Sequence, residues 1–347
     1  MRRMSRQDPH QPDLTQPAIT TMAWAPDRLA ARRGYLQRRD LLREATRAFF
    51  RARGYCEVET PYAVTAPGEE VFLSAFATER VATDGSRTKL WLHTSPEFAM
   101  KKLLAGGAGP IFQLARVWRN GEGSDTHAAE FTMLEWYRTE ADMDALMDEA
   151  ISLLRAVLPP EVTCRGVTTR LDQVERISVA EAFSRYLGVD VLASIGDAAQ
   201  LAADAKVKLR TGEAWDDLFF RLMLGSIEPH LGRAHPSLIT DWPAPLAALA
   251  QRHPHDGRMA QRFELYVCGI ELANGFVELT DANEQRARFI ADRTRRHQMN
   301  GHDDWPLDEE FIKAVADLPP CAGIAMGFDR LAMIASDAPR ITDVLWL

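Results

Sequence analysis

The sequence predicts an α+β protein in which antiparallel strand pairs are combined with helices. Residues 111–120 and 130–137 alternate in the manner of strands, and the polar, glycine-containing stretch 121–126 between them is typical of a loop joining antiparallel neighbours. A third strand-like run, residues 262–272, contains a turn signal at residues 267–269 that would fold it back on itself. With 347 residues, of which 46% are hydrophobic, the chain can bury a large core.

The first 25 residues predict a tail rather than an element of the fold. Several prolines stand there among polar neighbours, a composition that favours disorder or a mis-annotated start, with Met22 as the alternative to Met1. The fold is therefore expected to occupy residues 26–347.

Residues 36–53 predict a helix, because apolar side chains recur at helical spacing and Gly54 follows as a stop signal. The next residues, 55–60, alternate as a short strand before a proline. Nine arginines but only two acids lie between positions 28 and 53, in a chain whose 49 acids and 41 bases give a net charge of −8. This arginine cluster is either the solvated face of an amphipathic helix or a docking surface for an acidic partner.

Composition argues against several classes of protein. No window approaches the ~18 consecutive apolar residues of a membrane span, and the polar N-terminal residues lack the apolar stretch of a signal peptide. Cys56, Cys164, Cys268 and Cys321 stand far apart without zinc-site spacing, so they are interpreted as buried thiols in a reducing compartment. The cytoplasm is the expected location. The acidic net charge gives no general attraction to nucleic acid.

Thr94, Ser95, Pro96 and Glu97 precede the apolar residues 98–104 and have the marks of a helix start. A hydroxyl can cap the first turn, proline is favoured there, and a glutamate three residues on completes a capping box. Taken alone, Glu97 is interpreted as that capping carboxylate.

The first predicted strand pair carries polar side chains on an inward face. Strand periodicity puts Arg119 on the same face as Gln113. The return strand puts four side chains on one face: Phe131, Met133, Glu135 and Tyr137. A carboxylate and a phenol beside an aromatic ring are unusual in a plain core, which prefers valine and leucine. The alternative is the exposed polar face of an edge hairpin.

The third run carries two carboxylates, Glu264 and Glu271, which the turn at residues 267–269 would make cross-strand neighbours. Two adjacent carboxylates are a natural site for a hard cation. Asn274 follows on one face with Phe276 and Glu278, although the Asn-Gly dipeptide at 274–275 also favours a type I′ hairpin turn. Residues 140–260 are mostly helical by periodicity, notably 143–158, 179–187 and 215–224, and carry no recognisable catalytic pattern.

Near the carboxyl end, residues 323–331 place Arg330 at the close of a glycine-spaced apolar run, where backbone can approach a flat ligand and a guanidinium can meet phosphate. This segment, together with Arg119 and the loop leading to residues 127–131, resembles the ATP site of the class II aminoacyl-tRNA synthetases. The match runs from about Leu36 to Arg330, with five motifs in family order. The chain is identified as a member of the lysyl-tRNA synthetase paralogues that ligate lysine to elongation factor P.

This resemblance implies the class II synthetase catalytic fold, an antiparallel sheet flanked by helices, across residues 26–347. The helical stretch at about 140–260 is then an insertion between the second and third motifs. Residues 43–61 resemble the first motif, which implies a homodimer. Fewer than 40 residues precede the catalytic region, which leads us to expect no anticodon-binding barrel and no stable tRNA binding.

The resemblance also implies roles for individual residues. It implies these ATP-binding residues: Arg119, Asn120, His127, Phe131, Glu271, Leu272, Gly327 and Arg330. Arg119 and Arg330 would be catalytic, with Arg119 on the α-phosphate, Arg330 and His127 on the distal phosphates, and Phe131 under the adenine. Glu264 and Glu271 would hold Mg²⁺ between the phosphates.

For the amino acid, the resemblance implies these binding residues: Ser95, Pro96, Glu97, Glu135, Tyr137, Asn274, Glu278 and Ala325. Glu97 would lie near the α-amino group. Glu135, Tyr137 and Glu278 would bind the amino groups, because an unpaired buried cation costs several kcal/mol.

Three positions depart from the tRNA-charging pattern. Glu122 stands one residue beyond the usual second-motif glutamate, whose place Gly121 takes, so its equivalence is open. Alanines at 128 and 129 replace the usual Asn-Pro. Ala325 replaces a glycine, and a methyl in a fitted pocket costs about 1 to 3 kcal/mol. That methyl would disfavour an α-amino acid and prefer a β-amino acid.

The implied reaction forms an aminoacyl-adenylate from ATP and lysine or (R)-β-lysine, then transfers the aminoacyl group to the ε-amino group of one lysine of elongation factor P. No Ser/His or Cys/His pair is needed, because no covalent enzyme intermediate forms. The alternatives are a truncated tRNA-charging lysyl-tRNA synthetase and a catalytically retired regulatory paralogue.

Overall fold

The computed structural model describes residues 24–300 and 305–346. Residues 1–23 of the expected N-terminal tail, both candidate start methionines included, lie outside the described residues. Of the last two tail residues, Trp24 is exposed, whereas Ala25 is buried and immediately precedes the first helix.

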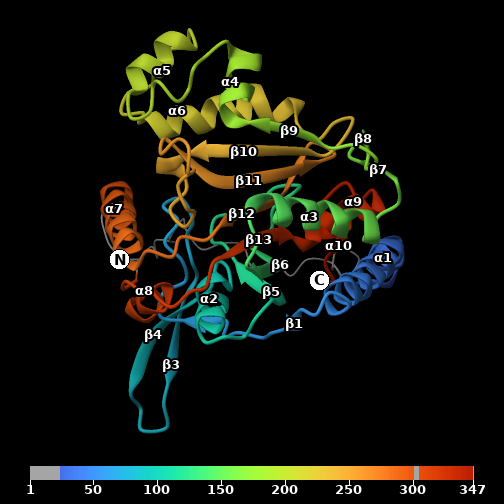
Figure 1. Cartoon of the computed structure of the whole chain (residues 1–347). Helices are drawn as coiled ribbons and strands as arrows, with labels where there is room; N and C mark the ends of the chain where they lie inside the picture. The colour runs from blue at the N-terminus through green and yellow to red at the C-terminus, as the bar shows by residue number, and fades with distance from the viewer. Residues whose placement is uncertain (1–23, 301–304, 347) are drawn as a thin grey trace, which may run out of the picture.

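One eight-stranded sheet organises the fold (Figure 1), in the order β1-β5-β6-β13-β12-β11-β10-β9. Its strands are β1 (Cys56–Glu57), β5 (Ile111–Trp118), β6 (Glu130–Thr139), β13 (Cys321–Gly327), β12 (Ile270–Val277), β11 (Met259–Val267), β10 (Ser237–Pro243) and β9 (Glu175–Ser178). The pairs from β5 to β10 are antiparallel, whereas the outermost strand at each edge pairs in parallel. The α+β prediction and the antiparallel pairing of 111–120 with 130–137 are confirmed.

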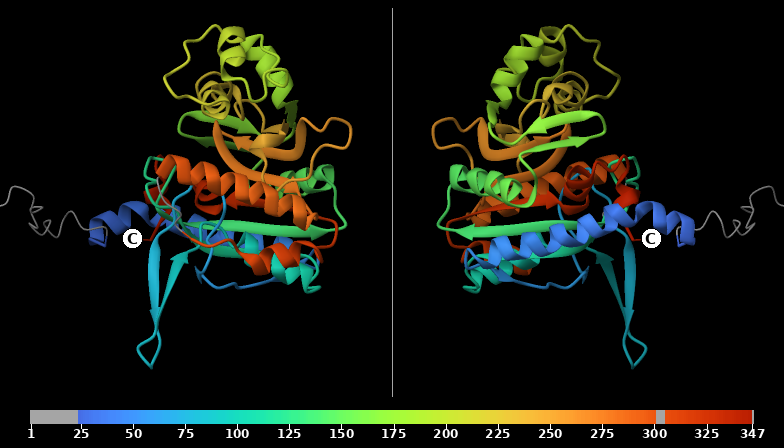
Figure 2. Two further views of the ribbon diagram at one scale, coloured as in Figure 1. Left: turned by 90° about the vertical axis from the view of Figure 1, so that its left-hand side faces the viewer. Right: turned by 90° about the vertical axis from the view of Figure 1, so that its right-hand side faces the viewer.

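Helices cover the sheet in two groups (Figures 1 and 2). The first group packs together over the main hydrophobic core and consists of α1 (Pro26–Arg51), α3 (Met143–Val157), α9 (Phe328–Ser336) and α10 (Ile341–Val344). The second consists of α2 (Glu97–Ala105), α7 (Ala282–Asn300) and α8 (Glu309–Val315). In this second group, the rings of Phe98 and Phe311 stack with centroids 4.1 Å apart, beside Phe289. The sheet is therefore flanked by helices, as the resemblance implied.

Helix α1 begins ten residues before the predicted start, because Pro26 suits the first helical position and good helix formers follow it. Several of its arginines have partners inside the protein. Arg39 is buried and pairs with Asp329 of α9 at 2.7 Å, and Arg47 and Arg51 both bind Glu57. Part of the arginine cluster therefore fastens α1 to the fold instead of forming a free face.

Residues 140–260 contain the three predicted helical stretches but also strands that periodicity missed. Helices α4 (Val179–Leu187), α5 (Ala198–Asp204) and α6 (Trp215–Leu222) build a lobe with its own core at the top of Figure 1. The prediction missed four short strands: β7 (Glu161–Cys164), β8 (Val167–Arg170), β9 and β10. Strand β10 is buried along nearly its whole length, so its sequence does not alternate as a half-exposed strand would.

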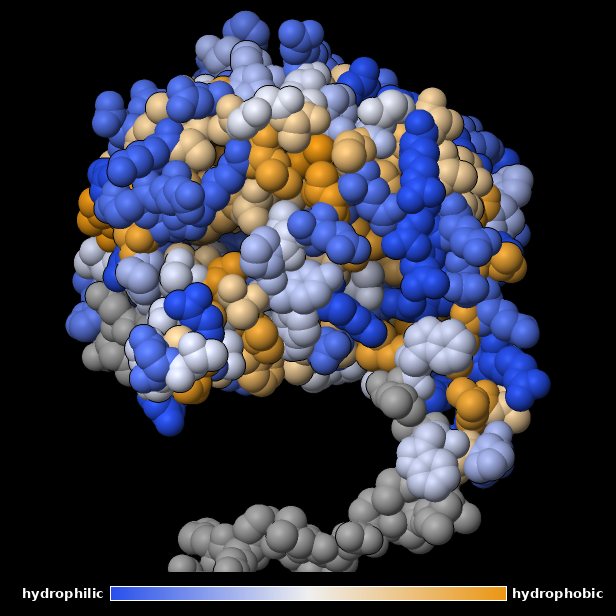
Figure 3. Space-filling model, turned by 90° about the horizontal axis from the view of Figure 1, so that it is seen from below, coloured by the Kyte–Doolittle hydropathy of each residue, from blue (hydrophilic) through white to orange (hydrophobic). Residues whose placement is uncertain are grey.

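A smaller sheet of β2 (Ala63–Val64), β4 (Arg87–Leu92) and β3 (Ala77–Val81) projects from the bottom of Figure 1. Seen from that side, hydrophilic residues surround separate apolar patches (Figure 3). No helix in the described part of the chain is long and apolar enough to cross a membrane. Three of the cysteines are buried free thiols as predicted, but Cys56 is exposed, because the strand that carries it lies at the sheet edge.

Candidate active site

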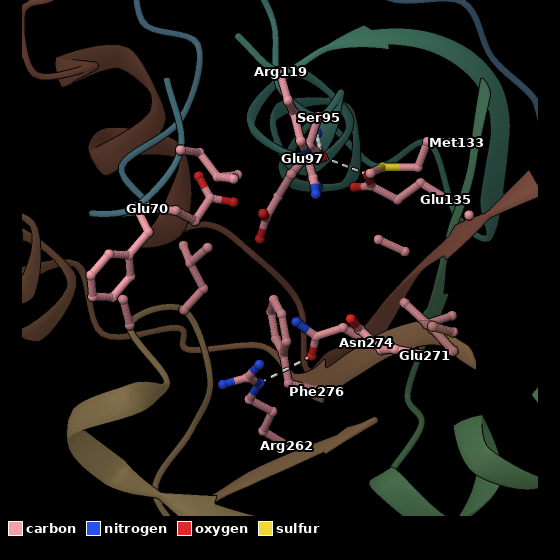
Figure 4. A pocket seen from close by; sticks show the side chains of 18 of the residues that line it. Glu70, Ser95, Glu97, Arg119, Met133, Glu135, Arg262, Glu271, Asn274 and Phe276 are labelled. Atoms are coloured by element: carbon pink, nitrogen blue, oxygen red, sulfur yellow. Dashed lines mark hydrogen bonds between the residues drawn. The ribbon is translucent and has the colours of Figure 1, made fainter. Parts of the chain in front are cut away.

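One cavity of about 390 Å³ brings most of the predicted site residues together (Figure 4). The predicted residues that line it are Ser95, Glu97, Arg119, His127, Phe131, Glu135, Tyr137, Glu271, Leu272, Asn274, Ala325, Gly327 and Arg330. They come from the central strands β6, β12 and β13, from the start of α2 and α9, and from the loop between β5 and β6. The exposed edge-hairpin alternative for β5 and β6 is wrong, because both strands have neighbours on either side.

Four predicted residues do not line the cavity. Pro96 is the residue before α2, and the exposed Asn120 gives its backbone N–H to the Ser74 carbonyl at 2.7 Å. Glu264 and Glu278 are buried behind the cavity wall, where other protein groups bind them. Contacts of these four with a ligand stay predictions.

Arg119 lies just after β5 with its guanidinium carbon 5.3 Å from the centre of the Phe131 ring. Its Nε is buried and has no hydrogen-bond partner among the described residues. Glu122 approaches Arg119 to 3.7 Å and also lines the cavity, after a turn at Gly121 with φ of +84°. The shifted acid therefore reaches the arginine, and the exposed part of the guanidinium faces the cavity, where it can meet an anionic ligand.

Arg330 is fixed from three sides at the start of α9. It donates to the Glu271 carbonyl at 2.6 Å and the Thr126 carbonyl at 3.2 Å, and its Nη2 lies 2.5 Å from His127 Nε2. Burial and the nearby Arg330 lower the pKa of His127. A neutral imidazole fits this pairing, accepting at Nε2 and donating from Nδ1 to Ser124 Oγ 2.8 Å away. The structure thus brings the two predicted phosphate ligands, Arg330 and His127, into contact.

Glu135 is the most completely buried carboxylate that lines the cavity. Ser95 Oγ and Tyr137 Oη donate to its two oxygens at 2.6 and 2.5 Å. Burial, and then the negative charge of Glu97, raise its pKa to about 8. Such a group gains strongly from a cation that replaces its lost hydration, so it is suited to bind an ammonium group.

Glu97 does not act as a capping-box carboxylate, and that interpretation is wrong. The hydroxyl of Ser95 accepts the Glu97 backbone N–H at 3.1 Å, whereas the Glu97 side chain turns to Lys101, one helical turn on, at 2.5 Å. Lys101 also forms an ion pair with Glu278. The backbone N–H of Thr94, which a capping box would satisfy, donates instead to the Pro67 carbonyl at 3.4 Å. Glu97 is therefore available to the buried ammonium of Lys101, which would be costly to leave unpaired.

Two positions on β13 shape the amino-acid part of the cavity. A Cβ on Gly323 would lie 2.3 Å from the Tyr137 ring and 2.5 Å from Glu278, so only glycine lets these side chains reach the wall. Ala325 pairs with Glu135 on one side and Asn274 on the other, and its methyl lines the cavity between them. The predicted place of this methyl in the pocket wall agrees with the structure.

The predicted turn at 267–269 is confirmed, with Cys268 and Gly269 in left-handed conformation at φ of +55° and +71°. The type I′ turn proposed for Asn274 and Gly275 is wrong, since both lie inside β12. Gly275 is needed there because a Cβ would lie 2.8 Å from the Phe263 ring.

Glu264 and Glu271 lie on the adjacent strands β11 and β12 but are not opposite each other as predicted: Glu264 pairs with Asn274, and Glu271 pairs with Tyr266. The two carboxyls still interact electrostatically. Burial, and then the charge of Glu271, raise the pKa of Glu264 to about 8. Arg262 and Tyr266 donate to the Glu264 oxygens at 2.6 and 2.9 Å, whereas the Glu271 side chain is 42% exposed. No cluster of three or more acidic, histidine or cysteine side chains in the described residues could cage a metal ion. The exposed Glu271 suits Mg²⁺ held by one carboxylate and substrate phosphates, whereas a contact of Glu264 with the ion stays a prediction, because both of its oxygens bind protein groups.

Sequence reasoning missed further residues of the wall. Glu70 enters from the loop before β3, and Arg262 orients Asn274 through a 3.1 Å hydrogen bond (Figure 4). Asp292 and Arg295 of α7 also line the cavity. Arg262 could have been found, because it lies two residues before Glu264 on the same strand face. Glu70 and Asp292 carry no local signal, since only the fold brings them to the cavity.

Comparisons with known proteins agree with this geometry. Residues 28–347 match the family model described as tRNA synthetases class II (D, K and N). The chain is 44% identical over 305 residues to the elongation factor P–(R)-β-lysine ligase of Proteus mirabilis, covering 86% of this chain and 90% of that protein. It is 43% identical over 335 residues to the enzyme of the same name from Pectobacterium atrosepticum, covering 94% and 97%. The Mannheimia succiniciproducens enzyme of that name is 42% identical over 328 residues, covering 93% and 96%.

Proposed function

Because the chain belongs to the class II aminoacyl-tRNA synthetase family, we propose that it is a ligase that attaches (R)-β-lysine or lysine to elongation factor P. ATP would activate the amino acid as an aminoacyl-adenylate. The ε-amino group of one lysine on elongation factor P would then accept the aminoacyl group. The name shared by its relatives supports this choice of acceptor.

The observation that carries the proposal is a single cavity lined by two buried carboxylates and two arginines. Glu97 and Glu135 are suited to the ammonium groups of a diamino acid, and Arg119 and Arg330 to phosphate. Burial raises the pKa of both carboxyls, so a cation that binds beside them favours their ionised forms. A cavity built for a neutral amino acid would have no reason to bury these acids.

In the first step, a carboxylate oxygen of the amino acid would attack the α-phosphorus of ATP, and pyrophosphate would leave. Glu97 and Glu135 would hold the amino groups of the substrate, and Glu278 would add negative charge from behind Gly323. Holding the amino groups fixes the position of the substrate's own carboxylate. Arg119 offers its guanidinium to the α-phosphate, and Arg330 meets the distal phosphates with His127. Mg²⁺, held by Glu271 and Glu264, would neutralise charge on the departing pyrophosphate.

In the second step, the neutral ε-amine of the acceptor lysine would attack the carbonyl carbon of the mixed anhydride. AMP leaves with the bonding electrons, and the amine nitrogen loses a proton as the amide forms. The chain supplies position and charge but no nucleophile, so no covalent enzyme intermediate is needed.

Two assays test the proposal. Amino-acid-dependent exchange of pyrophosphate into ATP measures the first step, and transfer of radiolabelled amino acid to elongation factor P or to tRNA identifies the acceptor. Label on tRNA alone would establish the tRNA-charging alternative. A folded protein with neither activity would support the regulatory alternative.

The assembly and location follow the same family relationship. We expect a two-fold homodimer through the region of α1 and β1, where Leu41 is 59% exposed, because closed two-fold dimers are the commonest assembly. Light scattering at micromolar concentration checks this, and a monomeric mass would contradict it. The cytoplasm remains the expected location, which fractionation of cells would test.

A further inference from the structure

Lys101 is an ammonium group that the protein itself places against the amino-acid pocket. Its side chain is 3% exposed, its Nζ lies 2.5 Å from Glu97 Oε1, and it forms an ion pair with Glu278. Aromatic rings surround it, with Phe276 at 5.1 Å, Phe311 at 5.9 Å and Tyr137 at 6.0 Å from Nζ to the ring centre. Burial alone would lower the pKa of Lys101, but Glu278 and Glu97 outweigh it and raise that pKa, so the side chain is charged.

Lys101 does not line the cavity, although both of its carboxylate partners reach the cavity or its wall. Glu97, one helical turn earlier, lines it, and Glu278 stands behind Gly323, the position where any side chain would clash with it. The ammonium is therefore fixed behind the pocket and leaves the cavity free for a ligand.

The charges in this part of the pocket can be counted. Glu97, Glu135 and Glu278 are carboxyls whose pKa values are raised by burial, to about 8 for Glu135 and Glu278. Within the described part of the chain, Lys101 is the one cation in ion-pair distance of any of them. When all are ionised, these three carboxylates and one ammonium leave two negative charges, apart from Glu70, whose charge also acts on Glu97 from another part of the cavity wall.

We propose that Lys101 is a built-in counter-ion that sets the pocket's charge at two, so that the pocket matches the two ammonium groups of a diamino acid. This inference rests on the proposed function, because it takes a diamino acid as the substrate. Lys101 is a positioning and specificity residue, since it acts through Glu97 and Glu278 and does not touch the substrate. Without it, the site would hold one more buried carboxylate than the ligand can pair.

The charge count predicts an unusual pattern among variants. Glu278→Gln keeps an oxygen acceptor behind Gly323 but removes a charge, so Lys101 is left to compete with the substrate for Glu97. We expect this variant to bind L-lysine and (R)-β-lysine about thirtyfold or more weakly than the wild type. The double variant Lys101→Met/Glu278→Gln removes one charge of each sign and restores two negative charges. We expect it to bind both amino acids at least about tenfold more tightly than Glu278→Gln.

Isothermal titration calorimetry with each amino acid measures these affinities, and pyrophosphate exchange separates KM for the amino acid from KM for ATP. Lys102→Met is the matched control: Lys102 is the next residue on α2 but pairs with Asp308 and Glu310, away from the cavity. It should leave the affinity for the amino acid unchanged. If Lys101 had a purely structural role, adding Lys101→Met to Glu278→Gln would not improve binding of the amino acid.

A double variant that folds but binds the amino acid no better than Glu278→Gln would overturn the proposal, as would a double variant that does not fold. The first result would mean that the charge of Glu278 acts on the substrate independently of Lys101. The second would mean that the Lys101–Glu278 ion pair is needed for folding. The failure of the proposed function is distinguishable, because the wild-type protein would then bind or activate neither amino acid.

Discussion

The two parts of the cavity that we propose to bind ammonium groups and phosphates are built in opposite ways. The ammonium-binding part consists of carboxylates buried on strands and a helix, with Glu135 1% exposed and held by two short hydrogen bonds. The phosphate-binding part consists of arginines at loop and helix ends, where the Arg119 side chain is 25% exposed. Rigid burial suits a small substrate selected by charge and shape, whereas accessible arginines suit a nucleotide that must enter and leave as pyrophosphate and AMP. The difference predicts that substitutions in the two parts affect different kinetic constants.

The largest expected effect is in the phosphate part. Arg119→Ala should reduce pyrophosphate exchange by about 10²- to 10³-fold or more, because the guanidinium that would stabilise charge on the α-phosphate in the transition state is lost. Arg116→Ala is the matched control, since Arg116 lies on β5, three residues before Arg119, but pairs at the surface with Glu130. If folded Arg119→Ala kept wild-type exchange, the phosphate role of Arg119 would be wrong.

The next prediction distinguishes the two parts of the cavity by which Michaelis constant changes, KM for the amino acid or KM for ATP. Glu135→Gln should raise KM for the amino acid by about thirtyfold or more, since a buried partner for an ammonium group loses its charge. KM for ATP should stay near the wild-type value. Glu130→Gln, on the exposed end of the same strand, serves as the control. Equal rises in both constants would contradict the division of the cavity.

A smaller effect concerns the shape of the ammonium part. Ala325→Gly should improve activation of α-lysine relative to β-lysine by about ten- to two-hundredfold in kcat/KM, the scale of one methyl group in a fitted pocket. The methyl lies between Glu135 and Asn274 in the cavity wall, so its removal enlarges the space beside the substrate backbone. Exchange assays with both isomers check this, and an unchanged ratio would remove the support that Ala325 gives to a β-amino acid.

The smallest expected effect is the change in KM for the amino acid with each pH unit. Glu135 and Glu278 have pKa values of about 8, and Glu97, Tyr137 and Lys101 surround them. Binding an ammonium group requires the ionised carboxylates, so KM for the amino acid should fall about tenfold per pH unit for each proton displaced between pH 6 and 8. KM for ATP should not follow this slope. A flat profile for the amino acid would show that these carboxyls are already ionised.

The same raised pKa values fix the sign for stability without substrate. The folded protein holds these protons up to about pH 8, whereas an unfolded glutamate releases them near 4.5. The free energy of unfolding should therefore decrease as the pH rises from about 4.5 to 8. Added lysine should reduce that loss, which thermal unfolding at several pH values would measure.

Local patterns predicted those parts of the fold in which neighbouring residues carry the information. The hairpin of β5 and β6 follows from alternation and a polar loop, and the turn at Cys268 and Gly269 from the glycine, which accepts positive φ. The strands of residues 140–260 were missed because β7, β8 and β9 are only four residues long and β10 is buried on both faces. Periodicity cannot distinguish a short buried strand from loop or helix.

The sequence by itself determined the family, the motif order and thirteen of the residues that line the cavity, because the motifs resemble those of the family and stand in its order. Only the tertiary structure decided how the charged side chains are paired. In the folded protein, Glu97 binds Lys101 instead of capping the helix, and Glu278 lies behind Gly323. The fold also brings Glu70 and Asp292 to the cavity wall. The physical reason is that burial makes unpaired charge costly, so distant residues settle which charges pair, and no local pattern records that choice.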